Sequence, residues 1–249
     1  MNPQNEIKSW IPAIWDAPPG IKAGITTRKG GCSIAPYDGF NLALHVGDKE
    51  SDVKQNRKYL KDNLSLIHEP IWLNQVHKSR VIKTGFNQNN VADGIISDTP
   101  QVPCAILIAD CVPLLICNSN GNKVGAIHVG WRGLVSGIID NAIHQFGSSP
   151  EDLLIWIGPH IRDHHYEVGR DVFDACVNLD KDLKTGFTTK DQDHWHANLE
   201  LMIKIILNKH GIYRVFNTSY CTYKDADLFY SYRRDGVTGR MASMIWIDE

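Results

Sequence analysis

Short runs of apolar residues alternate along the chain with longer stretches in which apolar residues recur every three or four positions. The short runs are bounded by turn residues and predict β-strands over residues 21–27, 71–76, 124–129, 153–157, 212–218, 228–232 and 242–247. Residues 103–117 form a longer β-like run, but Asp110, Cys111 and Pro113 interrupt it. Burying polar groups is costly, so this interruption requires a physical reason.

Two helical patterns are pronounced. The first covers residues 134–146, where the apolar residues share one face and Gly147 stands in the position expected after a C-cap. The second follows Asn198, a favourable N-cap residue, and ends at Gly211. Shorter helices are expected over residues 52–60 and 171–179.

Groups of strands interleaved with a few long helices predict an α+β fold or a layered α/β fold, because the regular βαβ alternation of a doubly wound sheet is missing. The 249 residues contain no linker-like stretch, internal repeat or low-complexity tract, so we expect one domain spanning residues 1–249. An apolar fraction of 43% and a charged fraction of 22% are ordinary for a chain that buries a large core.

The charge balance argues against two classes of partner. A net charge of −2 and a pI near 6.6 provide no concentrated basic face, so neither nucleic acid nor an anionic membrane is expected to bind. The first fifteen residues lack the features of a signal peptide, and no apolar run is long enough to cross a membrane. The six cysteines are widely spaced without a C-x-x-C motif, which favours free thiols and a cytoplasmic location.

Three residues carry the clearest candidate chemistry. His77, Cys111 and His128 each lie at or near the end of a predicted strand, where adjacent strands can bring them together. Two imidazoles and one thiolate are the ligands of a catalytic zinc site that keeps its fourth position open. The same residues also permit a second interpretation, in which Cys111 is a nucleophile activated by a histidine.

Several other polar residues are candidates for binding or positioning. Six arginines are possible anion ligands: Arg28, Arg57, Arg132, Arg233, Arg234 and Arg240. Arg132 is favoured among them because it stands in a Gly-bounded turn at a predicted helix start. Asp110 is expected either to orient a ligand or act as a base, or to be a satisfied buried carboxylate. The pairs His164-His165 and His194-Trp195-His196 are expected in polar surface loops, outside the metal site.

Eight sequence blocks in order resemble the laccase-domain proteins, whose members are also described as multicopper polyphenol oxidases and as purine nucleoside phosphorylases. The blocks are TTRKGGCS (26–33), FNLALHVGD (40–48), NQVHKSRV (74–81), ADGIISD (92–98), ADCVPLLI (109–116), GAIHVGWRGL (125–134), IGPHI with YEVG (157–169) and FYSYRRDGVTGRMASMIW (229–246). The resemblance implies zinc ligation by His77, Cys111 and His128. It also implies a layered α-β-β-α sandwich similar to cysteine-hydrolase folds.

The resemblance further implies phosphorolysis of adenosine, guanosine, inosine and methylthioadenosine, together with deamination of adenosine. Arg28, Asn41, Arg57 and Arg132 are then the expected substrate- and phosphate-binding residues, in a monomer or homodimer whose partners are small molecules. Copper is the second candidate metal under the oxidase description, but only His194 and His196 among eleven histidines form the His-x-His pair typical of a four-copper laccase. Two further hypotheses compete with the phosphorylase: a cysteine amidohydrolase acting on a peptide or cell-wall precursor, and a non-catalytic metal-dependent regulator.

Overall fold

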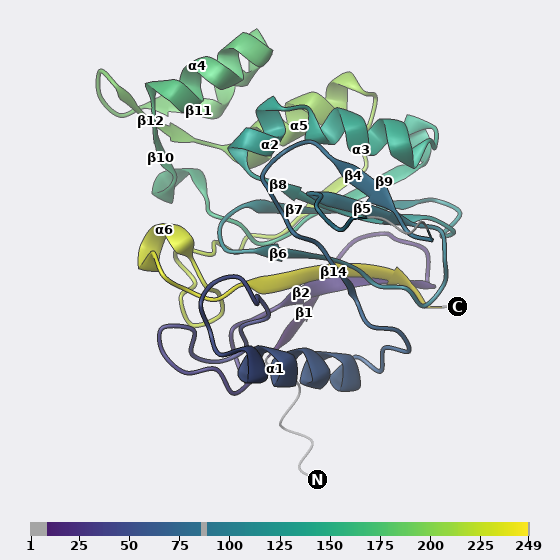
Figure 1. Cartoon of the computed structure of the whole chain (residues 1–249). Helices are drawn as coiled ribbons and strands as arrows, with labels where there is room; N and C mark the ends of the chain where they lie inside the picture. Colours follow the sequence, from purple (N-terminus) through teal and green to yellow (C-terminus); the bar gives the residue numbers. More distant parts are fainter. Residues whose placement is uncertain (1–8, 86–88, 249) are drawn as a thin grey trace.

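Two stacked β-sheets form the centre of the protein in a computed structural model that describes residues 9–85 and 89–248 (Figure 1). The first sheet contains, in spatial order, β1 (Trp10–Pro12), β2 (Ile21–Thr26), β14 (Met241–Ile247), β6 (Cys104–Ile108) and β3 (Ile71–Trp72). The second sheet contains, in spatial order, β13 (Val215–Asn217), β9 (Leu153–Ile157), β7 (Val112–Asn118), β8 (Val124–Val129), β5 (Gly94–Ser97) and β4 (Val81–Lys83).

Helices cover the outer face of each sheet. The helix α1 (Glu50–Asn63) lies against the five-stranded sheet, whereas α2 (Trp131–Val135), α3 (Ile138–Phe146) and α5 (Leu199–Lys209) lie over the six-stranded sheet (Figure 1). Buried apolar residues form one cluster between the two sheets and one beneath each helical layer. The expected α-β-β-α sandwich is therefore confirmed. Its similarity to cysteine-hydrolase folds stays a prediction.

A smaller unit stands at one end of the sandwich. Its sheet has the order β10 (Glu167–Gly169), β12 (His194–Ala197) and β11 (Phe187–Thr189). The remaining helices are α4 (Arg170–Leu179), the four-residue α6 (Tyr232–Asp235), and three short 3₁₀ helices, η1 (Pro150–Asp152), η2 (Asp163–His165) and η3 (Lys181–Gly186). The expectation that residues 194–196 lie in a polar loop is wrong, because Trp195 is buried in the apolar core and holds this segment in a strand.

The central strands are buried over their whole length because both faces of their sheets are covered. Every residue of β7, β8 and β9 is buried, which explains why their sequences are continuous apolar runs without alternation. The run at 103–117 is two strands, β6 and β7, that belong to different sheets. The polar residues Asp110 and Cys111 lie in the crossing between the sheets, just before the start of β7 and beside the end of β8.

The strand predictions at 21–27, 124–129, 153–157 and 242–247 are confirmed, as are the helices over 52–60 and 171–179. Asn198 caps α5 as expected, since its side chain accepts a hydrogen bond from the Leu201 amide. The helix expected over 134–146 is divided into α2 and α3, because Gly137 takes a left-handed backbone conformation with a φ of 79°.

Three predicted strands differ from the structure. Only Ile71–Trp72 of the 71–76 run and only Val215–Asn217 of the 212–218 run form strands. Residues 228–232 are not a strand, since the amides of Leu228 and Phe229 both bond to the Asp225 carbonyl in a turn. The apolar character of that run reflects burial of Phe229 and Tyr230 in the core.

No helix in residues 9–85 and 89–248 is long and apolar enough to cross a membrane. All six cysteines are free thiols, as the spacing predicted. Residues 1–8, part of the N-terminal segment in which no signal peptide is expected, lie outside the described residues.

Candidate metal centre

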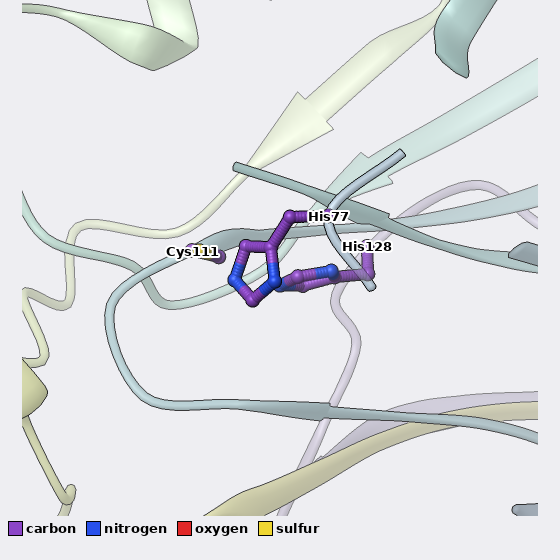
Figure 2. Close-up of side chains that lie close together, drawn as sticks. All are labelled: His77, Cys111 and His128. Atoms are coloured by element: carbon purple, nitrogen blue, oxygen red, sulfur yellow. The ribbon is translucent and has the colours of Figure 1, made fainter. Parts of the chain in front are cut away.

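The side chains of His77, Cys111 and His128 converge at one end of the six-stranded sheet, and Figure 2 shows them grouped together. Their ligand atoms all lie within 4.8 Å of one another, close enough to share one metal ion. The two imidazole rings meet edge to face, with centroids 4.7 Å apart. In the described part of the chain this is the one group of three or more His, Cys, Asp or Glu side chains that could hold a metal.

Strand pairing and loop conformation place these ligands. In the antiparallel pair of β7 and β8, Pro113 lies opposite His128, so Cys111 just before β7 reaches the same end as His128. His77 comes from the loop after β3 and has a φ of 56°. A non-glycine residue in this left-handed conformation is strained and persists only when its surroundings hold it.

Asp93 holds the loop that carries His77 in this conformation. It is completely buried, and one carboxylate oxygen accepts the His77 amide at 2.9 Å while the other accepts the amides of Val76 and Lys78 at 3.1 and 2.9 Å. The oxygen that binds the His77 amide also contacts Nδ1 of His128 at 2.9 Å. One carboxylate therefore fixes the loop that carries one ligand and the ring orientation of another.

Sequence reasoning missed Asp93 and considered Asp110 for the orienting role. The Asp110 carboxylate accepts the Thr222 hydroxyl and the Arg233 amide, both at 2.7 Å, and so corresponds to the satisfied-carboxylate interpretation. The signal for Asp93 was present in the sequence, because a lone carboxylate stands between Ala92 and the apolar residues of β5.

Charge interactions favour a thiolate at Cys111 and an imidazolium at His128 in the metal-free centre. Burial opposes ionisation of Cys111, but His128 and His77 outweigh it and lower the pKa of the thiol to about 6. Burial also opposes protonation of His128, but Cys111 and Asp93 raise its pKa to about 9. Burial disfavours the Asp93 carboxylate too, yet the hydrogen bonds from His128 and the loop amides lower its pKa. The thiolate form that a metal requires is thus favoured near neutral pH, and a metal bound by His128 would displace the proton from its imidazole.

Gly130 leaves space for this cluster. A Cβ atom at position 130 would lie 3.0 Å from Sγ of Cys111 and 3.3 Å from Cδ2 of His77. We expect Gly130→Ala to displace both ligands and to weaken metal binding about tenfold or more, comparable to the loss of an outer-sphere hydrogen bond. Because φ at Gly130 is −87°, alanine adds a steric clash without backbone strain.

Gly133 in α2 provides the matched control. A Cβ atom there would meet its nearest neighbour at an ordinary 3.4 Å. Gly133→Ala is expected to leave metal affinity unchanged and to stabilise the helix by up to about 1 kcal/mol. Competition with a chromophoric chelator gives both affinities, and equal affinities for the two variants would contradict the steric role of Gly130.

A cavity of about 530 Å³ opens beside the three ligands, within the size range of small-molecule sites. It is lined by apolar side chains, by the aromatic rings of Trp131, Tyr166 and Tyr232, and by Arg132, Arg233 and Arg240. Each arginine is stacked over one of these rings, at 4.3 Å for Trp131, 5.1 Å for Tyr166 and 5.8 Å for Tyr232. Stacking engages the face of a guanidinium and leaves its in-plane N–H groups able to donate. Nη1 of Arg233 and Nη1 of Arg240 already donate to backbone carbonyls, and their other guanidinium N–H groups have no hydrogen-bond partner in the described part of the chain.

The four residues expected to bind substrate or phosphate are not brought together. Arg132 lines the cavity, but Arg28 pairs with Asp38 at 3.0 Å beside a separate depression. Arg57 donates two hydrogen bonds to the Leu42 carbonyl, at 2.9 and 2.8 Å, and lies over the ring of the partly buried Trp72 at 4.0 Å. Burial lowers its pKa to about 10.

Asn41 is completely buried and likewise does not line the cavity. Its amide nitrogen donates to Ala43 and Asp48, and its oxygen accepts the backbone amides of Ala43 and Arg240. These contacts give Asn41 an architectural position behind the cavity. His45, from the same loop, does line the cavity, and sequence reasoning did not single it out.

The amino-acid sequence matches a known protein family. The family model for the multi-copper polyphenol oxidoreductase laccase matches residues 22–248. A Haemophilus influenzae protein named purine nucleoside phosphorylase is 40% identical over 237 residues, covering 94% of this chain and 97% of its own length. The Escherichia coli protein named purine nucleoside phosphorylase YfiH is 40% identical over 235 residues, covering 94% of this chain and 96% of its own.

Solved structures agree with the sequence comparisons. A crystal structure of a Neisseria meningitidis protein superposes with a TM-score of 0.93 at 38% identity, covering 97% of this chain and all of that one. The crystal structure of YlmD from Geobacillus stearothermophilus has a TM-score of 0.87 at 28% identity, covering 99% of this chain and 98% of that one. The chain therefore belongs to the multi-copper polyphenol oxidoreductase laccase family, whose relatives here are named purine nucleoside phosphorylases.

Proposed function

We propose that this protein is a zinc-dependent purine nucleoside phosphorylase that also deaminates adenosine. The observation that carries the proposal is a cluster of two imidazoles and one thiolate at the wall of a cavity large enough for a nucleoside. Three protein ligands of these types are the set of a catalytic zinc site with an open position. The relatives named purine nucleoside phosphorylases support the substrate class.

A zinc ion bound by His77, Cys111 and His128 would supply Lewis acidity and a water of lowered pKa. The chain's own groups prepare the site for this chemistry. Asp93 engages Nδ1 of His128 and so leaves Nε2 for the metal. The apolar walls contributed by Leu107, Ile161 and Leu199 exclude water from a bound purine.

Phosphorolysis and deamination place different demands on the cavity. In phosphorolysis an oxygen of phosphate bonds to the ribose C1 carbon, the glycosidic C–N bond breaks, and the base leaves with the electron pair and gains a proton. Cationic donors such as Arg132 offset the charge on phosphate. In deamination water replaces the 6-amino group of adenosine and ammonia leaves, the reaction class of the zinc deaminases.

A second candidate function rests on the chain of contacts from Asp93 through His128 to Cys111. The pKa shifts toward a thiolate and an imidazolium are those of an activated cysteine nucleophile. This arrangement favours a cysteine amidohydrolase. Copper oxidase chemistry has less support, because within the described residues one three-ligand group is present and a four-copper centre requires many more histidines.

Metal removal followed by a product assay tests the proposal. Purified protein is incubated with adenosine, with and without phosphate, before and after treatment with a chelator, and inosine, free base and ribose 1-phosphate are separated chromatographically. We expect phosphate-dependent formation of adenine and ribose 1-phosphate, phosphate-independent formation of inosine, and loss of both after chelation. Both activities should return when zinc is added back.

The competing hypotheses give different results in the same samples. Intact nucleoside with cleavage of a peptide amide would favour the amidohydrolase, and intact substrates in every assay would favour a metal-dependent regulator. We also propose a cytoplasmic location for the enzyme, since all six cysteines are free and a reducing compartment preserves the Cys111 thiolate.

A further inference from the structure

Arg240 is a cavity-lining cation without a carboxylate partner. Its Nη1 donates to the carbonyls of Thr238 and Gly239 at 2.8 and 2.9 Å, and no acidic side chain in the described part of the chain lies within ion-pair distance of it. Burial lowers its pKa, although the charges of Cys111 and Asp110 oppose that effect. A largely enclosed charge is normally paired, so its free donors facing a cavity indicate an anionic ligand.

Four arginines outside the cavity have the carboxylate partner that Arg240 lacks. Arg28, Arg162, Arg170 and Arg234 each form an ion pair with an aspartate or a glutamate. Arg132 and Arg233 also line the cavity, but both are more exposed than Arg240 and therefore keep more of their hydration. A guanidinium that has already lost water and has no counterion gains the most from an incoming anion.

The backbone around Arg240 is fixed in advance. Its amide donates to the side chain of Asn41 at 2.9 Å, and its carbonyl accepts the Leu42 amide at 3.3 Å. A Cβ atom at Gly239 would lie 2.7 Å from the ring of Tyr230, so the chain is tightly packed immediately before Arg240. Preorganised donors bind a ligand with little further loss of conformational entropy.

The same contacts bring His45 to the cavity. His45 follows Asn41 and Leu42 in one loop, and it lines the cavity together with Arg240. No hydrogen bond occupies its ring nitrogens among the described contacts, and an imidazole carries at least one N–H in either charge state. Gln75 also lines the cavity, but both ends of its amide are bonded to the Leu107 backbone at 2.8 and 2.7 Å. His45 is therefore an available donor that lines the cavity with Arg240.

We propose that Arg240 and His45 form an oxyanion subsite that holds a phosphate group beside the metal centre. The inference rests on the proposed phosphorylase function and identifies the residues that would present phosphate. An oxygen of hydrogenphosphate would form the bond to ribose C1, and its proton would end on the departing base. The same subsite chemistry would also accept the phosphate group of a nucleotide, and the experiment separates these two sources.

Phosphate binding and turnover are measured in the wild type, Arg240→Gln, Arg240→Lys and His45→Asn. We expect Arg240→Gln to raise the KM for phosphate about tenfold or more at saturating inosine, while the KM for inosine stays within about twofold, since charge-assisted bonds to phosphate are lost. Arg240→Lys should recover part of the loss. Arg170→Gln, which affects an exposed pair with Asp193, is the control and should behave as the wild type.

A second readout does not depend on catalysis. Phosphate alone should raise the Tm of the wild type in proportion to its binding, and this rise should be lost in Arg240→Gln and reduced in His45→Asn. A rise with adenosine monophosphate but not with inorganic phosphate, absent in the same variants, would identify the nucleotide as the source of the phosphate. If Arg240→Gln does not fold, the KM for phosphate and the phosphate-dependent Tm of His45→Asn are compared with those of the wild type instead.

The proposed phosphorylase function and the proposed phosphate subsite can be disproved independently. A wild type without phosphate-dependent cleavage of any purine nucleoside overturns the proposed phosphorylase, and the Tm experiment then decides the subsite by itself. A wild type that phosphorolyses inosine while Arg240→Gln keeps its KM and its phosphate-dependent Tm overturns the subsite alone.

Discussion

Cys111→Ser is expected to lower the affinity for zinc by more than about 100-fold and to reduce purine nucleoside turnover to background. Loss of a direct ligand should exceed the roughly 10–100-fold cost of losing an outer hydrogen-bond partner. Serine retains the shape of cysteine, but its hydroxyl does not ionise near neutral pH as the Cys111 thiol does. Elemental analysis after dialysis and a competitive zinc titration measure the change.

Cys32→Ser is the matched control, because Cys32 is an exposed free thiol outside the cavity. It should leave both zinc content and turnover unchanged. If Cys111→Ser loses turnover but keeps its full zinc content, the thiol is not a ligand, and the result would favour Cys111 as a nucleophile. A covalent substrate adduct on Cys111 in the wild type, detected by intact-protein mass spectrometry, would have the same meaning.

Asp93→Asn is expected to reduce the free energy of unfolding of the metal-free protein by about 3 kcal/mol. An asparagine side chain fits the space, but its NH₂ group must face either the amides of Val76 and Lys78 or the amide of His77 and the ring of His128. All of these backbone groups are donors, so one buried contact becomes repulsive. Denaturant unfolding of the metal-free proteins measures the effect.

The same substitution should weaken zinc binding about 10–100-fold, because Asp93 orients one ligand and holds the loop of another. Asp98→Asn, at an exposed site six positions after the start of the ADGIISD block, changes charge equally and should alter neither property. Unchanged stability in Asp93→Asn would mean that the carboxylate does not secure the loop that carries His77.

Cys111 and His128 were predictable as neighbours because each lies near a strand end, and strand ends in one sheet meet at a common edge. Because Pro113 pairs with His128, Cys111 and His128 lie at the same edge of the sheet. His77 is different, since β3 ends at Trp72 and the ligand is held by a strained loop on Asp93. Periodicity does not encode such a loop, so its supporting carboxylate was missed.

The cavity residues show the same limit. Arg28 and Arg57 have the side-chain chemistry of anion ligands. Their partners, Asp38 for Arg28 and the Leu42 carbonyl for Arg57, hold the two side chains away from the cavity. Whether an arginine faces a cavity depends on tertiary contacts such as the one between Asn41 and Arg240. The layered fold was more accessible, because fully covered strands must be apolar throughout, and these runs are visible in the sequence.

Zinc K-edge X-ray absorption of the purified protein tests the central claim most directly, because it reports the atoms bound to the metal. We predict one sulfur at about 2.3 Å and two imidazole nitrogens at about 2.0–2.1 Å, with the remaining position taken by a light atom. In Cys111→Ser the sulfur contribution should vanish. A wild-type protein that binds no metal, or whose bound zinc has no sulfur neighbour, would contradict a centre built from His77, Cys111 and His128.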